Sequence, residues 1–187
     1  MSRIDPKPIK QYPWRVRWFL LRQRRKYGRV LAPSYLWGRL PGPFLGVLAT
    51  LGFFQSKRYP IDAALRSLVS IRIAQLNGCF FCVDLNAHNF LRAAGDEAKA
   101  IGVAAWRDSG LYSPRERAAL DYAEAVTDRC AAVDGVQIDA LRAHFTDDQI
   151  TALTAWIAFQ NMSAKFNAAL GAEEHGFCRL DPPGRRG

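Results

Sequence analysis

The amino-acid sequence predicts an all-α protein, and three observations support this fold class. No stretch combines sustained apolar–polar alternation with β-branched residues, the pattern expected of a half-buried strand. Apolar residues instead recur at helical spacing between glycine, proline and capping residues. At 187 residues the chain fits a single domain, which can bury roughly 70% of the surface of its unfolded chain without disulfides or metal.

The N-terminal third predicts two helices. Trp14 to Tyr27 forms a basic helix in which Trp14, Trp18 and Leu21 lie on one face at i, i+4 and i+7. Phe44–Phe54 forms a second, apolar helix that follows two prolines. The apolar run over 41–54 is shorter than the roughly 20 residues of a membrane-spanning helix, so it indicates a buried or interfacial helix.

The middle of the chain predicts three more helices. Asp62 can cap a helix whose apolar residues recur at helical spacing up to Leu76. Cys79–Ala94 forms the next helix, with a glycine at the position after its end where glycine is favoured. A short helix is expected over Asp96–Asp108.

Two capping boxes predict the last helices. Ser113-Pro114-Arg115-Glu116 opens a helix to about Ala132, and Thr146 with Gln149 opens a long helix that ends at Leu170. The final six residues, 182–187, are expected to form a frayed tail.

Charge divides the chain into two parts. The net charge is +9, but residues 1–60 hold thirteen Lys or Arg against one acid (+12), and residues 61–187 hold thirteen against sixteen (−3). We therefore predict a basic, aromatic-rich helical arm (1–60), a helical domain (61–171) and a C-terminal tail (172–187). Four cysteines are too few for a secreted disulfide scaffold, and no export signal is evident, so the cytoplasm is the expected compartment.

The reactive motif is Cys79-Phe80-Phe81-Cys82. Its spacing brings two thiols within reach of a disulfide, and the preceding Asn77-Gly78 places both near a helix N-terminus, where a thiolate is stabilised. We favour a redox dithiol in which one thiolate attacks and the other resolves the product. Two small core cysteines are the plainer alternative.

A zinc site is least favoured, because the other cysteines and histidines do not have ligand spacing. Cys130 and Cys178 are interpreted as structural or incidental, and no metal or cofactor is expected.

Several segments resemble the carboxymuconolactone decarboxylase / alkylhydroperoxidase D (AhpD)-like family. The segments that carry the resemblance are Leu65–Val69, Gln75–Asp84, Ser113–Leu120, Leu141–Phe145, Ile157–Asn161 and Asn167–Gly171. The resemblance covers roughly residues 55–171 and implies an all-helical bundle that assembles as a homo-oligomer. In the thiol branch of the family it also implies peroxidase or disulfide reductase activity.

The resemblance implies that Cys82 is the attacking thiol and that Cys79 resolves the product or donates a proton. The thiol branch also uses a glutamate and a histidine as a proton relay, and the matching positions here are Ser67 and Asn86. Asn86 lies about 40° from Cys82 around the helix, on the face of the thiol. His88 lies about 120° away from Cys82 around the helix, between an acid and a base on a polar face. It stays a candidate catalytic residue, chiefly through contact with another helix or subunit.

Without the relay, another feature has to activate Cys82. No acid occurs between residues 63 and 81, whereas Arg66 and Arg72 lie on the preceding helix. Our hypothesis at this stage is that the helix N-terminus and an arginine together lower the pKa of the thiol.

The basic arm has three potential partners. We favour packing of its aromatic stripe on the acidic body or on a neighbouring subunit. An anionic membrane surface is the second alternative. Nucleic acid ranks last, because no recognised binding motif accompanies the charge.

The sequence therefore predicts a thiol-dependent oxidoreductase of the AhpD-like class. Its expected partners are a hydroperoxide or disulfide substrate, a protein or small-molecule thiol reductant, and further copies of itself. Two alternatives remain open. One is a non-redox enzyme of the lactone decarboxylase type, and the other is a helical oligomer with a vestigial dithiol that acts as a binding or membrane-surface module.

Overall fold

The computed structural model describes residues 2–128 and 133–177, and every regular element within them is a helix. The elements are η1 (Ile9–Gln11), α1 (Trp14–Tyr27), α2 (Ala32–Trp37), α3 (Pro41–Phe54), α4 (Ala63–Leu76), α5 (Phe80–Ala94), α6 (Glu97–Gly102), η2 (Val103–Asp108), α7 (Pro114–Thr127), α8 (Gly135–Arg142) and α9 (Asp147–Ala169). The predicted all-α fold class is therefore confirmed for this part of the chain.

Several predicted boundaries are corrected. The short helices η1, α2 and α8 were not expected, and α3 begins at Pro41 rather than Phe44. The expected helix over Asp96–Asp108 is divided into α6 and the 3-10 helix η2, and η2 itself is kinked at Ala105, where the backbone leaves the helical region. Helix α7 ends at Thr127, and the rest of its predicted course to residue 132 lies mostly outside the described residues.

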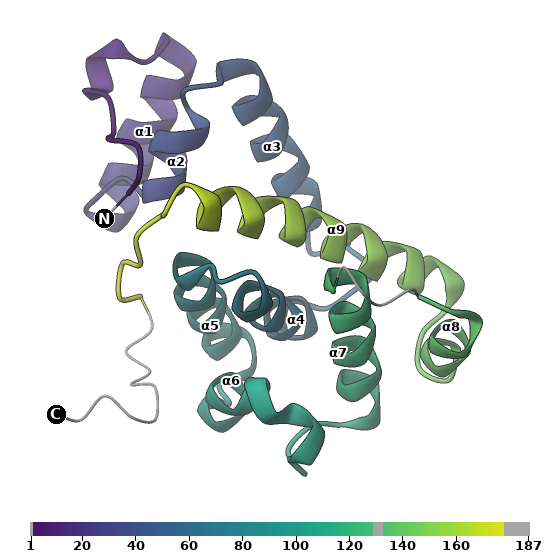
Figure 1. Cartoon of the computed structure of the whole chain (residues 1–187). Coiled ribbons are helices and arrows are strands. Elements are labelled where there is room, and N and C mark those ends of the chain that lie inside the picture. The colour runs from purple at the N-terminus through teal and green to yellow at the C-terminus, as the bar shows by residue number, and fades with distance from the viewer. Residues whose placement is uncertain (1, 129–132, 178–187) are drawn as a thin grey trace, which may run out of the picture.

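The central helix of the body is α4, which contacts α5, α7 and α9. Its apolar residues Leu68, Val69, Ile71 and Ile73 point to several sides of the helix and are all fully buried. Helix α9 runs between α1–α3 on one side and α4–α7 on the other (Figure 1). A helix buried on all sides needs a partner on each face, which is why α4 forms the centre of the core.

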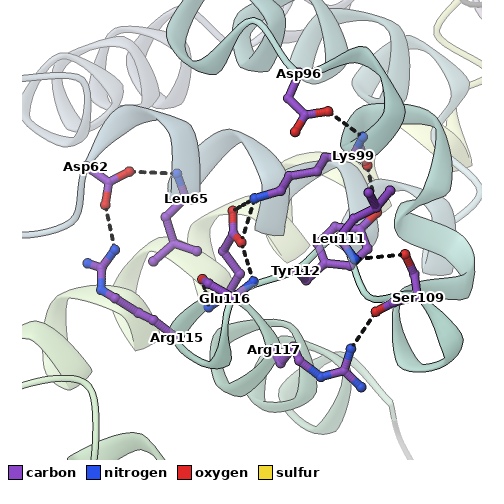
Figure 2. Close-up of polar contacts among 11 residues, drawn as sticks. Asp62, Leu65, Asp96, Lys99, Ser109, Leu111, Tyr112, Arg115, Glu116 and Arg117 are labelled. Atoms are coloured by element: carbon purple, nitrogen blue, oxygen red, sulfur yellow. Dashed lines mark hydrogen bonds and ion pairs between the residues drawn. The ribbon is translucent and has the colours of Figure 1, made fainter.

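Capping and ion pairs fix the start of three helices around this core. The predicted caps Asp62 and Ser113 accept hydrogen bonds from the third helical residue of α4 and α7. Lys99 donates to both carboxylate oxygens of Glu116 at 2.8 Å, and Arg115 pairs with Asp62 at 2.9 Å (Figure 2). These contacts connect α6, α7 and the N-terminus of α4.

The basic N-terminal helices pack on their own chain. Val16 and Leu20 of α1 are fully buried, and the ring of Trp37 stacks on Phe166 of α9 with centroids 3.9 Å apart. The predicted packing of the Trp14–Trp18 stripe is nevertheless wrong within this chain, because these two side chains are 67% and 61% exposed. The opposite face of α1, with Val16 and Leu20, packs on the rest of the chain.

Two further predictions are corrected by burial. Helix α3 buries only Phe44 within the chain, so the buried alternative for residues 41–54 does not hold. Residues 172–177, which were expected to belong to a tail, instead pack against α5. We call residues 172–177 the C-terminal strap. The predicted frayed end at 182–187 lies outside the described residues.

Within the described ranges, no helix is both long enough and apolar enough to cross a bilayer.

Candidate functional site

The turn between α4 and α5 positions the Cys-x-x-Cys motif. Asn77 ends α4, and Gly78 adopts a left-handed conformation with φ of +64° that glycine tolerates without strain. The Asn77 amide donates to the carbonyl of Ile73 and to Asn161 of α9, both at 2.9 Å. Because the chain reverses here, Cys79 becomes the N-cap of α5.

Cys79 and Cys82 are joined by a disulfide, with Cα atoms 5.2 Å apart. Cys79 Sγ accepts the backbone N–H of Cys82 at 3.3 Å, so sulfur takes the place of the oxygen of an ordinary N-cap residue. Cys82 is the third residue of the helix, where backbone N–H groups lack carbonyl partners and the helix dipole is positive. The structure thus brings the two predicted thiols together at a helix N-terminus.

Asn167 of α9 is the side chain that touches the sulfur of Cys82. Its Nδ2 donates to Cys82 Sγ at 3.4 Å, and the residue is only 3% exposed. Its Oδ1 is buried and has no hydrogen-bond partner. Asn167 was not among the residues predicted from the sequence. The available signal was a polar residue on a buried stripe of α9 that includes Ile157, Asn161 and Ala164 at helical spacing.

The candidate relay positions contact backbone rather than sulfur. Asn86 lies on the thiol's side of α5, as expected, but its Nδ2 donates to the Cys82 carbonyl at 2.8 Å. The hydroxyl of Ser67 donates to the carbonyl of Ala63. His88 is half-buried, and its ring lies 6.0 Å from the ring of Phe177 in the strap. None of these three side chains has a hydrogen bond to the sulfur of either cysteine.

The arginine hypothesis for thiol activation is overturned. Arg72 is paired with Glu124 and also bonds Gln75. The guanidinium of Arg66 lies 5.2 Å from the ring centroid of Tyr59 and 5.7 Å from that of Trp156, and burial lowers its pKa. Neither guanidinium is hydrogen-bonded to a cysteine, and the groups next to Cys82 Sγ are Asn167 and the N-terminus of α5.

The dithiol is covered on all sides. Cys79 is 2% exposed and Cys82 is 6% exposed. They form a buried cluster with Leu31 of the α1–α2 connection, Phe81, and Ala164 of α9. Ala172 and Phe177 of the strap pack on the same cluster. A substrate can therefore reach sulfur only after one of these segments moves.

Asp84 holds the strap in place. Its Oδ2 accepts the backbone N–H groups of His175 at 3.1 Å and Phe177 at 3.0 Å. Asp84 is buried, so the interpretation of His88 as part of a solvated ladder with Asp84 is corrected. The carboxylate is a buried anchor of the strap.

His175 joins the strap to the N-terminal helices. Its Nε2 accepts the backbone N–H of Ala32 at 3.0 Å, and the guanidinium of Arg29 lies 3.5 Å from its Nδ1. Burial and then the nearby Arg29 cation lower the pKa of His175. The ring also lies edge-on to Phe81, with centroids 5.6 Å apart.

A pocket of about 280 Å³ lies beside this junction. Its walls include Ile4, Val30, Tyr35 and His175. Within the described residues, no group of three or more His, Cys, Asp or Glu side chains is arranged to hold a metal ion. Cys130 and Cys178 lie outside the described residues.

The fold and the motif define a class: an all-helical, AhpD-like protein with a Cys-x-x-Cys pair at a helix N-terminus. The family model of the carboxymuconolactone decarboxylase family matches residues 44–125. The protein YnjA of Escherichia coli K12 is 42% identical over 173 residues, which cover 92% of this chain and 95% of YnjA. The chain therefore belongs to the carboxymuconolactone decarboxylase / AhpD-like family.

Solved structures share the fold over almost the whole chain. A peroxidase-related protein of Ralstonia eutropha JMP134, described as an alkylhydroperoxidase AhpD core, has a TM-score of 0.83 at 23% identity, covering 94% of this chain and 93% of its own. The debrominase Bmp8 has a TM-score of 0.76 at 18% identity, covering 92% and 91%. At these identities the likeness establishes the fold.

Proposed function

We propose that the protein is a thiol-dependent oxidoreductase that cycles Cys79 and Cys82 between dithiol and disulfide. The observation that carries the proposal is the disulfide-bonded pair at the N-terminus of α5. The oxidising substrate is a hydroperoxide or a disulfide, and a protein or small-molecule thiol returns the electrons. The proposal needs no cofactor.

With a hydroperoxide, the Cys82 thiolate attacks the outer oxygen. An S–O bond forms as the O–O bond breaks, and the alkoxide takes a proton to leave as an alcohol. Cys79 then attacks the sulfenic sulfur of Cys82, the S–S bond forms and water leaves. Two electrons and two protons from the reductant restore both thiols.

Asn167 takes the activating role in this scheme. Its Nδ2–H, directed at Cys82 Sγ, favours the thiolate over the neutral thiol, because a hydrogen bond to a charged acceptor is stronger. Its unpartnered Oδ1 offers an acceptor for the O–H of an incoming hydroperoxide. Asn86, bonded to the Cys82 carbonyl, supports the turn of helix that holds the thiol.

The test is thiol mapping by mass spectrometry after one equivalent of hydroperoxide is added to the reduced protein. We expect rapid formation of a Cys79–Cys82 disulfide that a reductant reverses. Cys79→Ser should stop at a sulfenic acid on Cys82, and Cys82→Ser should leave Cys79 reduced. Unchanged thiols in a folded protein would contradict the proposal and favour a vestigial dithiol.

Two other expectations remain proposals. One is self-association, which light scattering coupled to size-exclusion chromatography measures. The other is a cytoplasmic location, which cell fractionation measures.

A further inference from the structure

The outer face of α1 carries an apolar strip that nothing in the described chain covers. Taking about 100° per residue, Trp18, Leu21 and Arg25 lie within about 40° of Trp14 around the helix. Both tryptophans are mostly exposed, and a hollow of about 180 Å³ is lined by Trp18, Leu21, Arg22 and Arg25. Single exposed apolar residues are ordinary, but two tryptophans and a leucine on one face form a patch.

Arginines border this strip on both sides. Arg22 and Arg15 lie about 80° and 100° to one side of Trp14, while Arg17 and Arg24 lie about 60° and 80° to the other. The guanidinium of Arg15 lies 5.2 Å from the ring centroid of Trp14, and that of Arg22 lies 5.6 Å from Trp18. Aromatic side chains in the centre with cationic heads at the edges are typical of a helix that lies in a membrane interface.

The charge that α1 itself carries is entirely positive. The helix has six basic residues and no acid, and the sequence contains no acid between Asp5 and Asp62. Apart from stacking on neighbouring rings, the basic side chains of α1 take part in no ion pair among the described residues. This uncompensated charge complements an anionic surface.

The opposite face of α1 holds the helix in place. Val16 and Leu20 are fully buried against Tyr12, Val30 and Phe44. The helix is therefore already formed in the folded protein, and binding through the outer strip does not require a disordered segment to fold. A preformed site avoids that ordering cost.

We propose that α1 docks the protein on the surface of an anionic lipid bilayer. The helix lies parallel to the surface, with Trp14, Trp18 and Leu21 at the level of the head groups and the arginines paired with lipid phosphates. Nucleic acid offers the same phosphates, but a duplex backbone leaves the apolar centre of the strip without a contact. The inference concerns the outer face of α1 and does not depend on the proposed redox activity.

The test is flotation of the full chain with vesicles of phosphatidylcholine, alone or mixed with phosphatidylglycerol. We expect binding to the mixed vesicles that weakens as salt rises, and little binding to phosphatidylcholine alone. Arg22→Glu/Arg25→Glu should lower the partition coefficient by on the order of tenfold or more. Trp14→Ala/Trp18→Ala should also weaken binding and should abolish a blue shift of tryptophan emission on mixed vesicles.

The matched control is Arg92→Glu/Lys165→Glu, which changes the net charge equally at exposed positions of α5 and α9. It should keep most of the binding, and circular dichroism should show all variants folded. Absence of binding to the anionic vesicles, or equal losses in the control and the α1 variants, would overturn the proposal. So would binding to DNA or RNA without vesicle binding, or a dimer that the α1 variants dissociate, since these assign the strip to another partner.

Discussion

Replacing Asp84 with alanine is expected to uncover the dithiol. The carboxylate accepts two backbone N–H groups of the strap, those of His175 and Phe177, and the strap packs on the cluster around both cysteines. Asp84→Ala removes the oxygen that accepts both bonds while leaving the cysteines and Asn167 in place. The strap then keeps its side-chain contacts, the bond between His175 and Ala32, the bond from Ser2 to Glu173 and the backbone bond from Ala172 to Asn167.

The size of the effect follows from the two lost bonds. A hydrogen bond to a charged group contributes about 1.5–3 kcal/mol. Two such bonds at the lower limit hold the strap closed by about 3 kcal/mol, which corresponds to roughly a hundredfold change in the opening equilibrium. If access to Cys82 requires this opening, its modification rate should rise by the same order.

Two assays on the reduced protein separate the steps. Hydrogen exchange at the amides of His175 and Phe177 measures opening of the strap, and alkylation by a bulky maleimide measures access to Cys82. Glu174→Ala is the matched control, because this residue of the strap is exposed and supplies neither of the two N–H groups that Asp84 accepts. Faster exchange in Asp84→Ala with an unchanged alkylation rate would refute the reasoning, because the strap would then open without controlling access.

Three further outcomes are expected. Asn167→Ala should slow alkylation of Cys82 by a small reagent at neutral pH by on the order of tenfold, since one hydrogen bond to a charged acceptor is lost. Asn167→Asp, of the same shape, should slow it further, and an unchanged rate in both would exclude the donor role. Because the pKa of His175 is lowered in the folded chain, closure of the strap should be complete above about pH 6.5 and should weaken as pH falls through the range where histidine is protonated. Hydrogen exchange of the strap against pH measures this, and His175→Gln should flatten the profile. Light scattering should report more than one copy per particle, and a monomer at micromolar concentration would contradict the expected self-association.

The features of the fold that local physics determines were predicted from the sequence. The caps at Asp62, Ser113 and Thr146 stand where expected, because a side-chain oxygen three residues before an unpaired N–H is a local signal. Helices α2 and α8 were missed because six and eight residues give too few turns for a periodic pattern. For α3 the sequence predicted a buried or an interfacial helix without choosing between them, because hydropathy alone does not say which surface covers an apolar helix.

The residues of the candidate site also fall into two groups, those that a local motif predicted and those that depend on tertiary packing. Cys79 and Cys82 were found because both belong to one short motif and lie on one turn of α5. Asn167 was missed because it is 85 residues away and its contact with Cys82 exists only once α9 is packed on α5. The strap was missed for the same reason, since its anchor at Asp84 is 91 residues from His175.

Where the thiol branch of the family has a titratable relay, this chain has a serine and an asparagine, and this difference changes where protons for the proposed reaction come from. Asn167 can stabilise the Cys82 thiolate, but an amide does not release a proton to a departing alkoxide. With Ser67 and Asn86 bonded to backbone carbonyls, the remaining donors are the Cys79 thiol and water. Water reaches a dithiol this deeply buried only when the strap or another covering segment moves. In the proposed cycle, admission of substrate and delivery of the proton therefore depend on the same opening, which makes Asp84 and His175 as important to turnover as the groups at the sulfur.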